Sequence, residues 1–223
     1  AKAGVKIWVL TGDKEETAIN IAVACNLVLP KQYMKQVIIN GKTAPTREAM
    51  IKCFDTAITE YTADLDKTGS STLPRALIID GPSLAMATVN KSMLLADLDT
   101  CKKLKEKLLD FAQRCKAVVG CRVSPDQKRE MVDLIKTGVG GVRTLAIGDG
   151  ANDVAMIQEA HIGIGIKGEE GLQAVNSADY AIAQFRYLSD LLLKHGRFNY
   201  VRMAGLVCYM FYKNVFMSMG QFW

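Results

Sequence analysis

The 223-residue sequence lacks features that mark several classes of protein. It has only two histidines, His161 and His195, and its six cysteines form no Cys-x-x-Cys pair, so a zinc site is not expected. No signal peptide precedes the first apolar segment, which favours a reducing compartment and free, buried thiols. A net charge of +5, spread along the chain, is too small to indicate nucleic-acid binding.

The composition that remains is that of a folded domain, with 49% hydrophobic and 23% charged residues. Short runs of successive apolar residues, typical of strands buried on both faces, alternate with stretches of helical pattern. The predicted strands are 7–10, 76–79, 117–120, 144–147, 162–166 and 180–183. The predicted helices are 14–26, 47–58, 92–115, 125–136, 154–160 and 168–176. This alternation predicts an α/β fold with a parallel sheet, helices on both faces, and ligands at the carboxyl ends of its strands.

Two regions depart from the alternation. Residues 59–75 are polar and rich in turn formers, so we expect a surface loop there. Residues 203–223 contain no Asp, Glu, Arg or Pro and only one Lys, which approaches the ~20 apolar residues that span a bilayer. Because Lys213, Asn214 and Gln221 interrupt this stretch, a buried core helix is the alternative.

The first of three polar motifs, Thr11-Gly12-Asp13, directly follows the first predicted strand. A hydroxyl at a strand end can donate to a phosphate oxygen, and the glycine lets backbone approach a ligand closely. Asp13 could orient a ribose hydroxyl or cap the next helix. Ordinary turn and capping chemistry explains the same three residues, and it is the alternative.

The second motif, Ser124 to Lys128, follows the third predicted strand. Ser124 is a favourable N-cap, Pro125 suits the first helical position, and Gln127 completes a capping box. These residues place Lys128 in the first helical turn, where its charge can neutralise a phosphoryl group. A plain helix start with a solvated lysine is the alternative.

The third motif, Gly148 to Asp153, follows the fourth predicted strand and holds two carboxylates. Asp149 and Asp153 suit Mg²⁺, which binds one or two carboxylates together with phosphate and water. A turn followed by an Asn or Asp cap is the alternative. Together, the hydroxyl, the lysine and the paired carboxylates at strand ends predict a phosphoryl-transfer site.

Several longer stretches carry a family resemblance. TGDK at 11–14, CRVSPDQK at 121–128 and GDGANDVAMI at 148–157 resemble P-type ATPases in general, whereas 163–174, 177–197 and 209–214 resemble phospholipid flippases. Over nearly its whole length, the chain resembles the C-terminal part of the phosphorylation domain of type IV P-type ATPases. The resemblance implies a haloacid-dehalogenase-like fold, Mg²⁺ as cofactor, ATP as substrate, and Mg-dependent formation of an aspartyl-phosphate as phospholipid moves to the cytoplasmic leaflet.

The same resemblance implies roles for individual residues. The implied catalytic residues are Lys128, Thr11, Gly12 and Asn152. The residues implied to bind ATP or phosphate are Thr11, Gly12, Asp13, Arg122, Lys128, Asn152 and Asp153. The implied Mg²⁺ ligands are Asp149 and Asp153, and the lipid path would include Lys213 and Asn214.

The resemblance also implies a domain division and partners. Residues 1–194 would form the phosphorylation-domain segment, and 195–223 would form a stalk and the start of a transmembrane helix. The positive side chains near this junction, Arg186, Lys194, Arg197 and Arg202, suit a cytoplasmic membrane face, with residues 1 to about 200 on that side. The implied partners are a phospholipid, the membrane, actuator, nucleotide-binding and transmembrane parts of a longer protein, and an accessory glycoprotein subunit.

The family's nucleophile is an aspartate in a DKTGT motif that follows an apolar strand and precedes TGD, and this chain has no such motif before Thr11. We reject the similar stretch from Asp66 to Ser70 because it follows TGD and no buried strand precedes it. The chain alone is therefore expected neither to turn over ATP nor to move lipid. A soluble phosphatase of the same fold and a flippase-like regulatory module fused to another enzyme are the alternatives.

Overall fold

The computed structural model describes residues 4–68, 73–87, 95–168 and 171–222. The strands are β1 (Ile7–Leu10), β2 (Lys35–Ile39), β3 (Arg75–Asp80), β4 (Ala117–Cys121), β5 (Leu145–Gly148), β6 (Ile162–Ile166) and β7 (Tyr180–Ile182). The helices are α1 (Glu15–Ala24), α2 (Arg47–Thr68), α3 (Gly81–Ala87), α4 (Leu95–Arg114), α5 (Pro125–Gly138), α6 (Val154–Glu159), α7 (Gln173–Asn176), α8 (Leu188–Asp190) and α9 (Gly196–Gly220). Single turns of 3₁₀ helix, Ala151–Asp153 (η1) and Phe185–Tyr187 (η2), and a π-helical turn, Leu191–His195 (η3), complete the elements.

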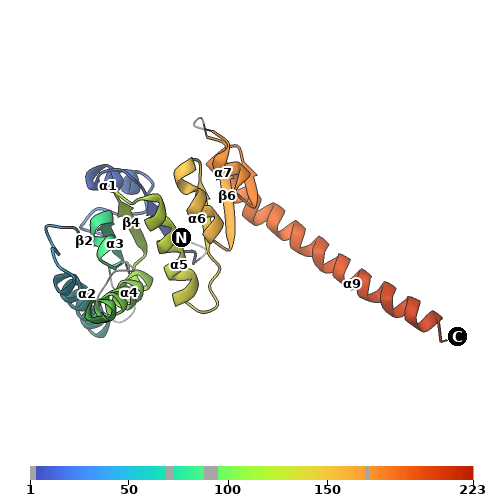
Figure 1. The fold of residues 1–223 in the computed structure, drawn as a ribbon, viewed down its shortest axis with the longest axis horizontal. Helices are drawn as coiled ribbons and strands as arrows, with labels where there is room; N and C mark the ends of the chain where they lie inside the picture. The colour runs from blue at the N-terminus through green and yellow to red at the C-terminus, as the bar shows by residue number, and fades with distance from the viewer. Residues whose placement is uncertain (1–3, 69–72, 88–94, 169–170, 223) are drawn as a thin grey trace.

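All strand pairs are parallel, as predicted, but the strands form two sheets. The four-stranded sheet has the order β1-β4-β3-β2, and the three-stranded sheet has the order β5-β6-β7. Helices separate the strands in sequence and cover the sheets, with α5 and α6 lying between the two groups of strands (Figure 1). The α/β class with parallel strands and surrounding helices is therefore confirmed.

The core of the four-stranded sheet has two apolar layers. On one face, Phe54 of α2 and Phe111 of α4 are fully buried, with ring centroids 5.9 Å apart. On the other face, Ala18 and Ala22 of α1 pack with Met34 and with residues of β3 and β4. Every residue of β3 and β4 is buried, which explains why these strands are apolar on successive rather than alternate residues.

The surface loop predicted at 59–75 is wrong for most of its described residues, because α2 continues through Thr68. Tertiary contacts override the weak helical pattern here. The buried guanidinium of Arg75 donates to the Ala57 carbonyl at 2.6 Å and to Asp64 at 2.7 Å, and it lies over the Tyr61 ring. Lys35 also binds Asp64, at 2.6 Å, and both cations hold the Asp64 pKa below its ordinary value. Arg75 itself begins β3, and residues 69–72 lie outside the described part.

Other elements differ less from the prediction. β2 and α3 were not predicted, and the helix expected at 168–176 is reduced to α7, with 169–170 outside the described residues. The helix expected from residue 92 is described from Leu95. Strands β1, β3, β4, β5, β6 and β7 lie within two residues of their predicted positions.

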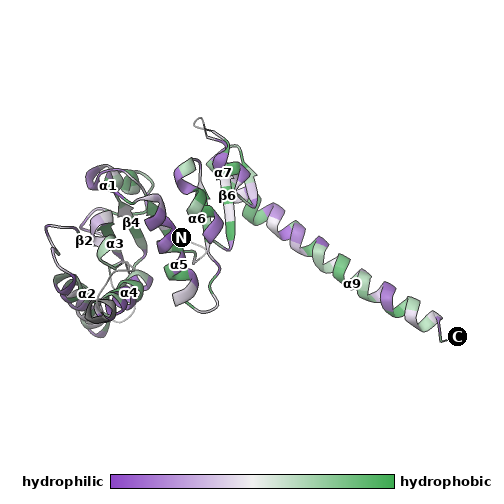
Figure 2. Ribbon diagram, in the orientation of Figure 1, coloured by the Kyte–Doolittle hydropathy of each residue, from purple (hydrophilic) through white to green (hydrophobic). Residues whose placement is uncertain are grey.

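Residues 203–222 are helical as far as Gly220, and α9 projects away from the α/β body (Figure 1). Its residues are exposed, so α9 is not buried in any core that the described residues form. Figure 2 shows hydrophobic turns of α9 interrupted by hydrophilic ones. Within the described ranges, no helix combines the length and the apolar character needed to cross a membrane, so the predicted start of a transmembrane helix is not confirmed.

Candidate active site

Backbone pairing brings the first two motifs together at the carboxyl end of the four-stranded sheet. β1 and β4 are neighbours, and their ladder continues past both strands. The Arg122 amide donates to the Asp13 carbonyl at 2.9 Å, and the Val123 amide donates to the Thr11 carbonyl at 3.0 Å. The loop after β1 and the loop before α5 therefore lie side by side, held by main-chain atoms that leave the side chains of Asp13 and Arg122 exposed.

The first motif shows turn chemistry and also an open face. The Thr11 hydroxyl donates to Asp13 Oδ2 at 2.8 Å and accepts from the Asp13 amide at 3.2 Å, and Asp13 does not cap α1. These bonds are the ordinary turn chemistry that the sequence offered as the alternative. The Thr11 hydroxyl is therefore already hydrogen-bonded within its own loop. Gly12 is exposed, and no atom lies within 4 Å of the point where a Cβ would be, so a ligand could approach its backbone.

The second motif folds as predicted. Ser124 caps α5, Pro125 occupies the first turn, and both hydrogen bonds of the capping box to Gln127 are present. Lys128 is only 9% exposed, and its Nζ lies 2.8 Å from Asp153 Oδ1. The alternative of a solvated lysine is therefore wrong.

The third motif is arranged for more than capping. Asp153 stands at the start of α6 and makes no side-chain capping bond there. Asp153 instead faces Lys128, and it lies so close to Gly148 that a Cβ there would be 2.3 Å from the Asp153 Cβ. Glycine is required at 148 because this approach leaves no room for a side chain.

Asp149, at the carboxyl end of β5, offers the most available carboxylate of the site. It is exposed and forms no hydrogen bond or ion pair with residues of the described part. In the same part of the chain, no three His, Cys, Asp or Glu side chains lie together so that they could hold a metal ion. A hard cation that takes one or two carboxylates and otherwise phosphate and water fits Asp149, whereas a fully protein-ligated metal does not.

The predicted residues thus form two separate groups in the structure. Thr11, Gly12 and Asp13 lie against Arg122, and Lys128 is paired with Asp153. No hydrogen bond or ion pair joins these two groups directly across the described residues. Arg122 connects them only along the chain, because it lies just before α5, the helix that carries Lys128. Its backbone has a positive φ of 52°. The sequence reasoning missed Gly81 at the end of β3, although an Asp-Gly pair after an apolar run is a recognisable strand-end signal.

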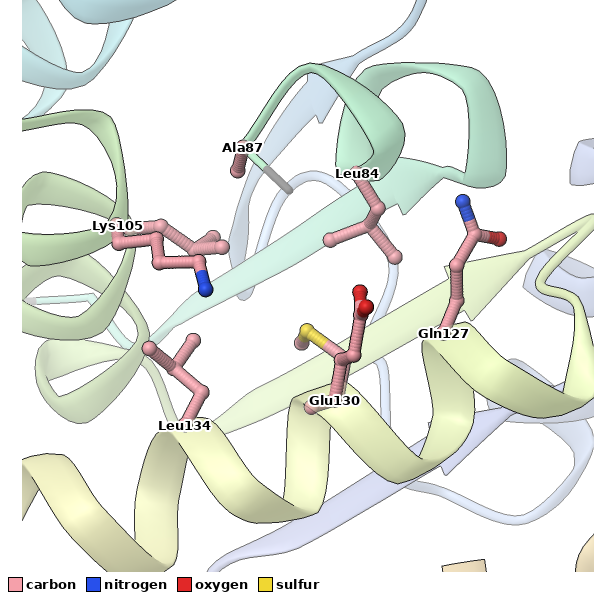
Figure 3. A pocket seen from close by; sticks show the side chains of 8 residues that line it. Leu84, Ala87, Lys105, Gln127, Glu130 and Leu134 are labelled. Carbon is pink, nitrogen blue, oxygen red and sulfur yellow. The ribbon is translucent and has the colours of Figure 1, made fainter. Parts of the chain in front are cut away.

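Side chains outside the three motifs lie apart from this site. Lys213 and Asn214 are exposed on α9, beside a stacked Tyr212–Phe216 pair. Asp66 lies on the exposed surface of α2, which agrees with its rejection as a strand-end nucleophile. A small cavity between α3, α4 and α5 is lined by apolar side chains together with Lys105, Gln127 and Glu130 (Figure 3), and none of the predicted site residues lines it.

The expectation of free, buried thiols is confirmed only in part. All six cysteines are free, but only Cys101, Cys115 and Cys121 are buried, whereas Cys25 and Cys208 are exposed. Burial raises the pKa of Cys115 to about 12 and that of Cys121 to about 11. The buried thiols therefore behave as small apolar groups rather than as nucleophiles.

Comparisons with known proteins identify relatives of this chain. A family model described as the C-terminal part of phospholipid-translocating P-type ATPases matches residues 175–223. Probable phospholipid-transporting ATPase 11 of Arabidopsis thaliana is 47% identical over 96% of this chain, which corresponds to 18% of that relative. Probable phospholipid-transporting ATPase IM of Homo sapiens is 45% identical over 99% of the chain and 19% of the relative, and phospholipid-transporting ATPase C887.12 of Schizosaccharomyces pombe is 46% identical over 99% and 16%.

The chain therefore spans less than a fifth of the length of these curated relatives. The matched region covers almost all of the residues of this chain. The chain belongs to the family of phospholipid-transporting P-type ATPases.

Proposed function

We propose that the chain is the part of an ATP-driven phospholipid flippase that holds the phosphoryl group during transfer and connects that site to the membrane. The observation that carries this proposal is the position of the three motifs at strand ends, with Asp13 bonded to the loop of Arg122 and Lys128 paired with Asp153. The names of the relatives supply the substrate class, a phospholipid, and the energy source, ATP. A soluble phosphatase or a fused regulatory module gains no support from these relatives.

In the proposed reaction, Lys128 would neutralise part of the charge of the phosphoryl group, and a bound Mg²⁺ would supply further positive charge. Asp149, with Asp153, would hold Mg²⁺, and Asn152, which is exposed in η1, would complete that side of the site. Lys128 provides a cation fixed by its capping box, and the open backbone of Gly12 allows phosphate oxygens to approach. Asp13 and Arg122, both exposed beside this rim, would contact ATP. The aspartate that accepts the phosphoryl group would come from outside these residues.

The remaining parts of the proposal concern the membrane. The α9 helix would be the stalk, residues 1–194 the phosphorylation-domain segment, and Lys213 and Asn214 would face the lipid path. Positive side chains cluster where α9 begins, and Lys194 is paired with Asp190 at 2.7 Å. This charge suits the cytoplasmic surface of an integral membrane protein. Actuator, nucleotide-binding and transmembrane parts, and an accessory glycoprotein subunit, would be the partners.

The test is Asp149→Asn in a full-length flippase that contains this chain. Phosphoenzyme is measured with labelled ATP across a Mg²⁺ titration, and we expect the loss of at least ~3 kcal/mol of transition-state stabilisation, enough to reduce turnover more than a hundredfold. The matched control is Asp133→Asn, the same chemical change at an exposed position of α5.

Normal ATP hydrolysis by the Asp149→Asn protein, at the same Mg²⁺ dependence as the control, would contradict the proposal. A label that maps to Asp66 in the 223-residue chain alone would contradict it as well, because that residue lies on a helix rather than at a strand end.

A further inference from the structure

The corner between β3 and α3 contacts the loop that carries Arg122, although none of the three motifs includes it. β3 pairs with β4, with Asp80 opposite Cys121, so the two strands end together. Gly81 is buried directly after Asp80, and a Cβ on Gly81 would lie 2.1 Å from the Arg122 carbonyl oxygen. This contact is with backbone, so an alanine at 81 must displace the loop rather than a flexible side chain.

Gln127 connects the same corner to the start of α5. Its Oε1 accepts from the Ser124 amide at 2.9 Å, which is half of the capping box. Its Nε2 donates to the Gly81 carbonyl at 2.8 Å, which capping does not require. In Figure 3, the Gln127 side chain rises from α5 toward the α3 side of the pocket. One amide therefore fixes the first turn of α5 against the end of β3.

The residues held by this corner are the ones assigned to the ligand. Lys128 follows Gln127 directly, and its ammonium must reach the site from the first turn of α5. Arg122 has a positive φ of 52°, a conformation that a non-glycine residue adopts only when its surroundings hold it there. Its amide is bonded to Asp13 on one side, and its carbonyl lies against Gly81 on the other.

We propose that the Gly81 corner and the Gln127 amide are positioning elements for the phosphoryl-binding Lys128 and the ATP-binding Arg122. Neither Gly81 nor Gln127 touches the ligand in this proposal, which rests on the proposed function of the chain. Gln127 acts through Lys128, so its loss lowers the rate of phosphoryl transfer. Gly81 acts mainly through Arg122, so its loss also weakens ATP binding.

The first test separates the two hydrogen bonds of Gln127. Gln127→Glu keeps the oxygen that accepts from Ser124, because glutamate serves equally well in a capping box, but it removes the donor to Gly81. Asp126→Asn in the same protein restores the charge of this exposed turn, and Asp126→Asn alone is the matched control. In a full-length flippase that contains this chain, we expect kcat to fall about tenfold in the double variant, the size typical of one lost neutral hydrogen bond, with the KM for ATP unchanged and the protein still folded at the assay temperature.

The second test is Gly81→Ala, with Gly41→Ala as control, because no atom lies within 4 Å of the Cβ position at Gly41. We expect Gly81→Ala to raise the KM for ATP as well as to lower kcat. Wild-type kinetics in the Gln127→Glu/Asp126→Asn protein would overturn the inference, and so would a loss of activity that parallels a loss of folded protein. If the unmodified flippase formed no phosphoenzyme, the proposed function itself would fail, which is a separate outcome.

Discussion

The two sheets differ in how completely they are buried. In the four-stranded sheet, all residues of β3 and β4 are buried between helices on both faces. In the three-stranded sheet, only β6 has a continuous buried stretch, and Leu145 and Tyr180 of the outer strands are 37% and 45% exposed. The four-stranded sheet therefore supplies most of the apolar burial, whereas the three-stranded sheet carries the exposed Asp149.

The difference shows a division between stability and chemistry. In the proposed function Asp149 binds a hydrated cation and therefore has to remain accessible, and a strand end in a thinly covered sheet provides that access. The opposing cation, Lys128, comes instead from α5, which packs on the better buried sheet through Met131. The Lys128–Asp153 pair joins the two regions, and its geometry depends on both.

The largest expected effect is on the four-stranded sheet. Phe111→Ala removes a fully buried ring that packs on Phe54, and we expect a loss of about 3–5 kcal/mol in the free energy of unfolding. Denaturant titration followed by the fluorescence of Trp8, which packs against the same core, measures this loss. Tyr180→Ala at an exposed position of the three-stranded sheet is the comparison, and a loss of similar size there would contradict the division.

Much of this architecture could be predicted because local pattern and burial agree. The apolar runs of β3 and β4 are buried on both faces, so every residue in them carries the signal. β2 was missed because its first residues, Lys35 and Gln36, are polar. The end of α2 was missed because it depends on Arg75 reaching Ala57 and Asp64, contacts between residues distant in sequence.

The candidate site was predictable to the extent that its chemistry is local. The capping box that places Lys128 can be read from four consecutive residues, and the structure contains it. The partner of Lys128 could not be read in this way, because Asp153 lies 25 residues away, at the start of α6. The contact between Gly81 and Arg122 was equally hidden, since it arises from the pairing of β3 with β4.

An intermediate loss in the free energy of unfolding is expected at the Lys128–Asp153 ion pair, which joins the two regions. Asp153→Asn leaves the Lys128 cation, which is largely buried, without its carboxylate, and we expect a loss of about 1–3 kcal/mol in the free energy of unfolding. Glu159→Gln is the matched control, because the Lys136–Glu159 pair also joins α5 to α6 but is more exposed, and less than ~1 kcal/mol is expected. Denaturant titration of both variants measures the difference, and equal losses would show that burial of the first pair has no energetic consequence.

The smallest expected effect is on how the free energy of unfolding changes at alkaline pH, and it tests how tightly the core of the four-stranded sheet is buried. Because burial raises the Cys115 pKa from 9.0 to about 12, the folded chain keeps a proton that the unfolded chain loses. Stability contributed by this thiol is complete below pH 9 and falls as the pH rises toward 12, by roughly 1 kcal/mol at pH 10. Cys115→Ala should flatten this decline between pH 8 and pH 10, whereas Cys25→Ala, at an exposed position, should leave it unchanged. The same slope in all three proteins would mean that another group controls alkaline unfolding, and that the tight burial of the four-stranded sheet does not extend to Cys115.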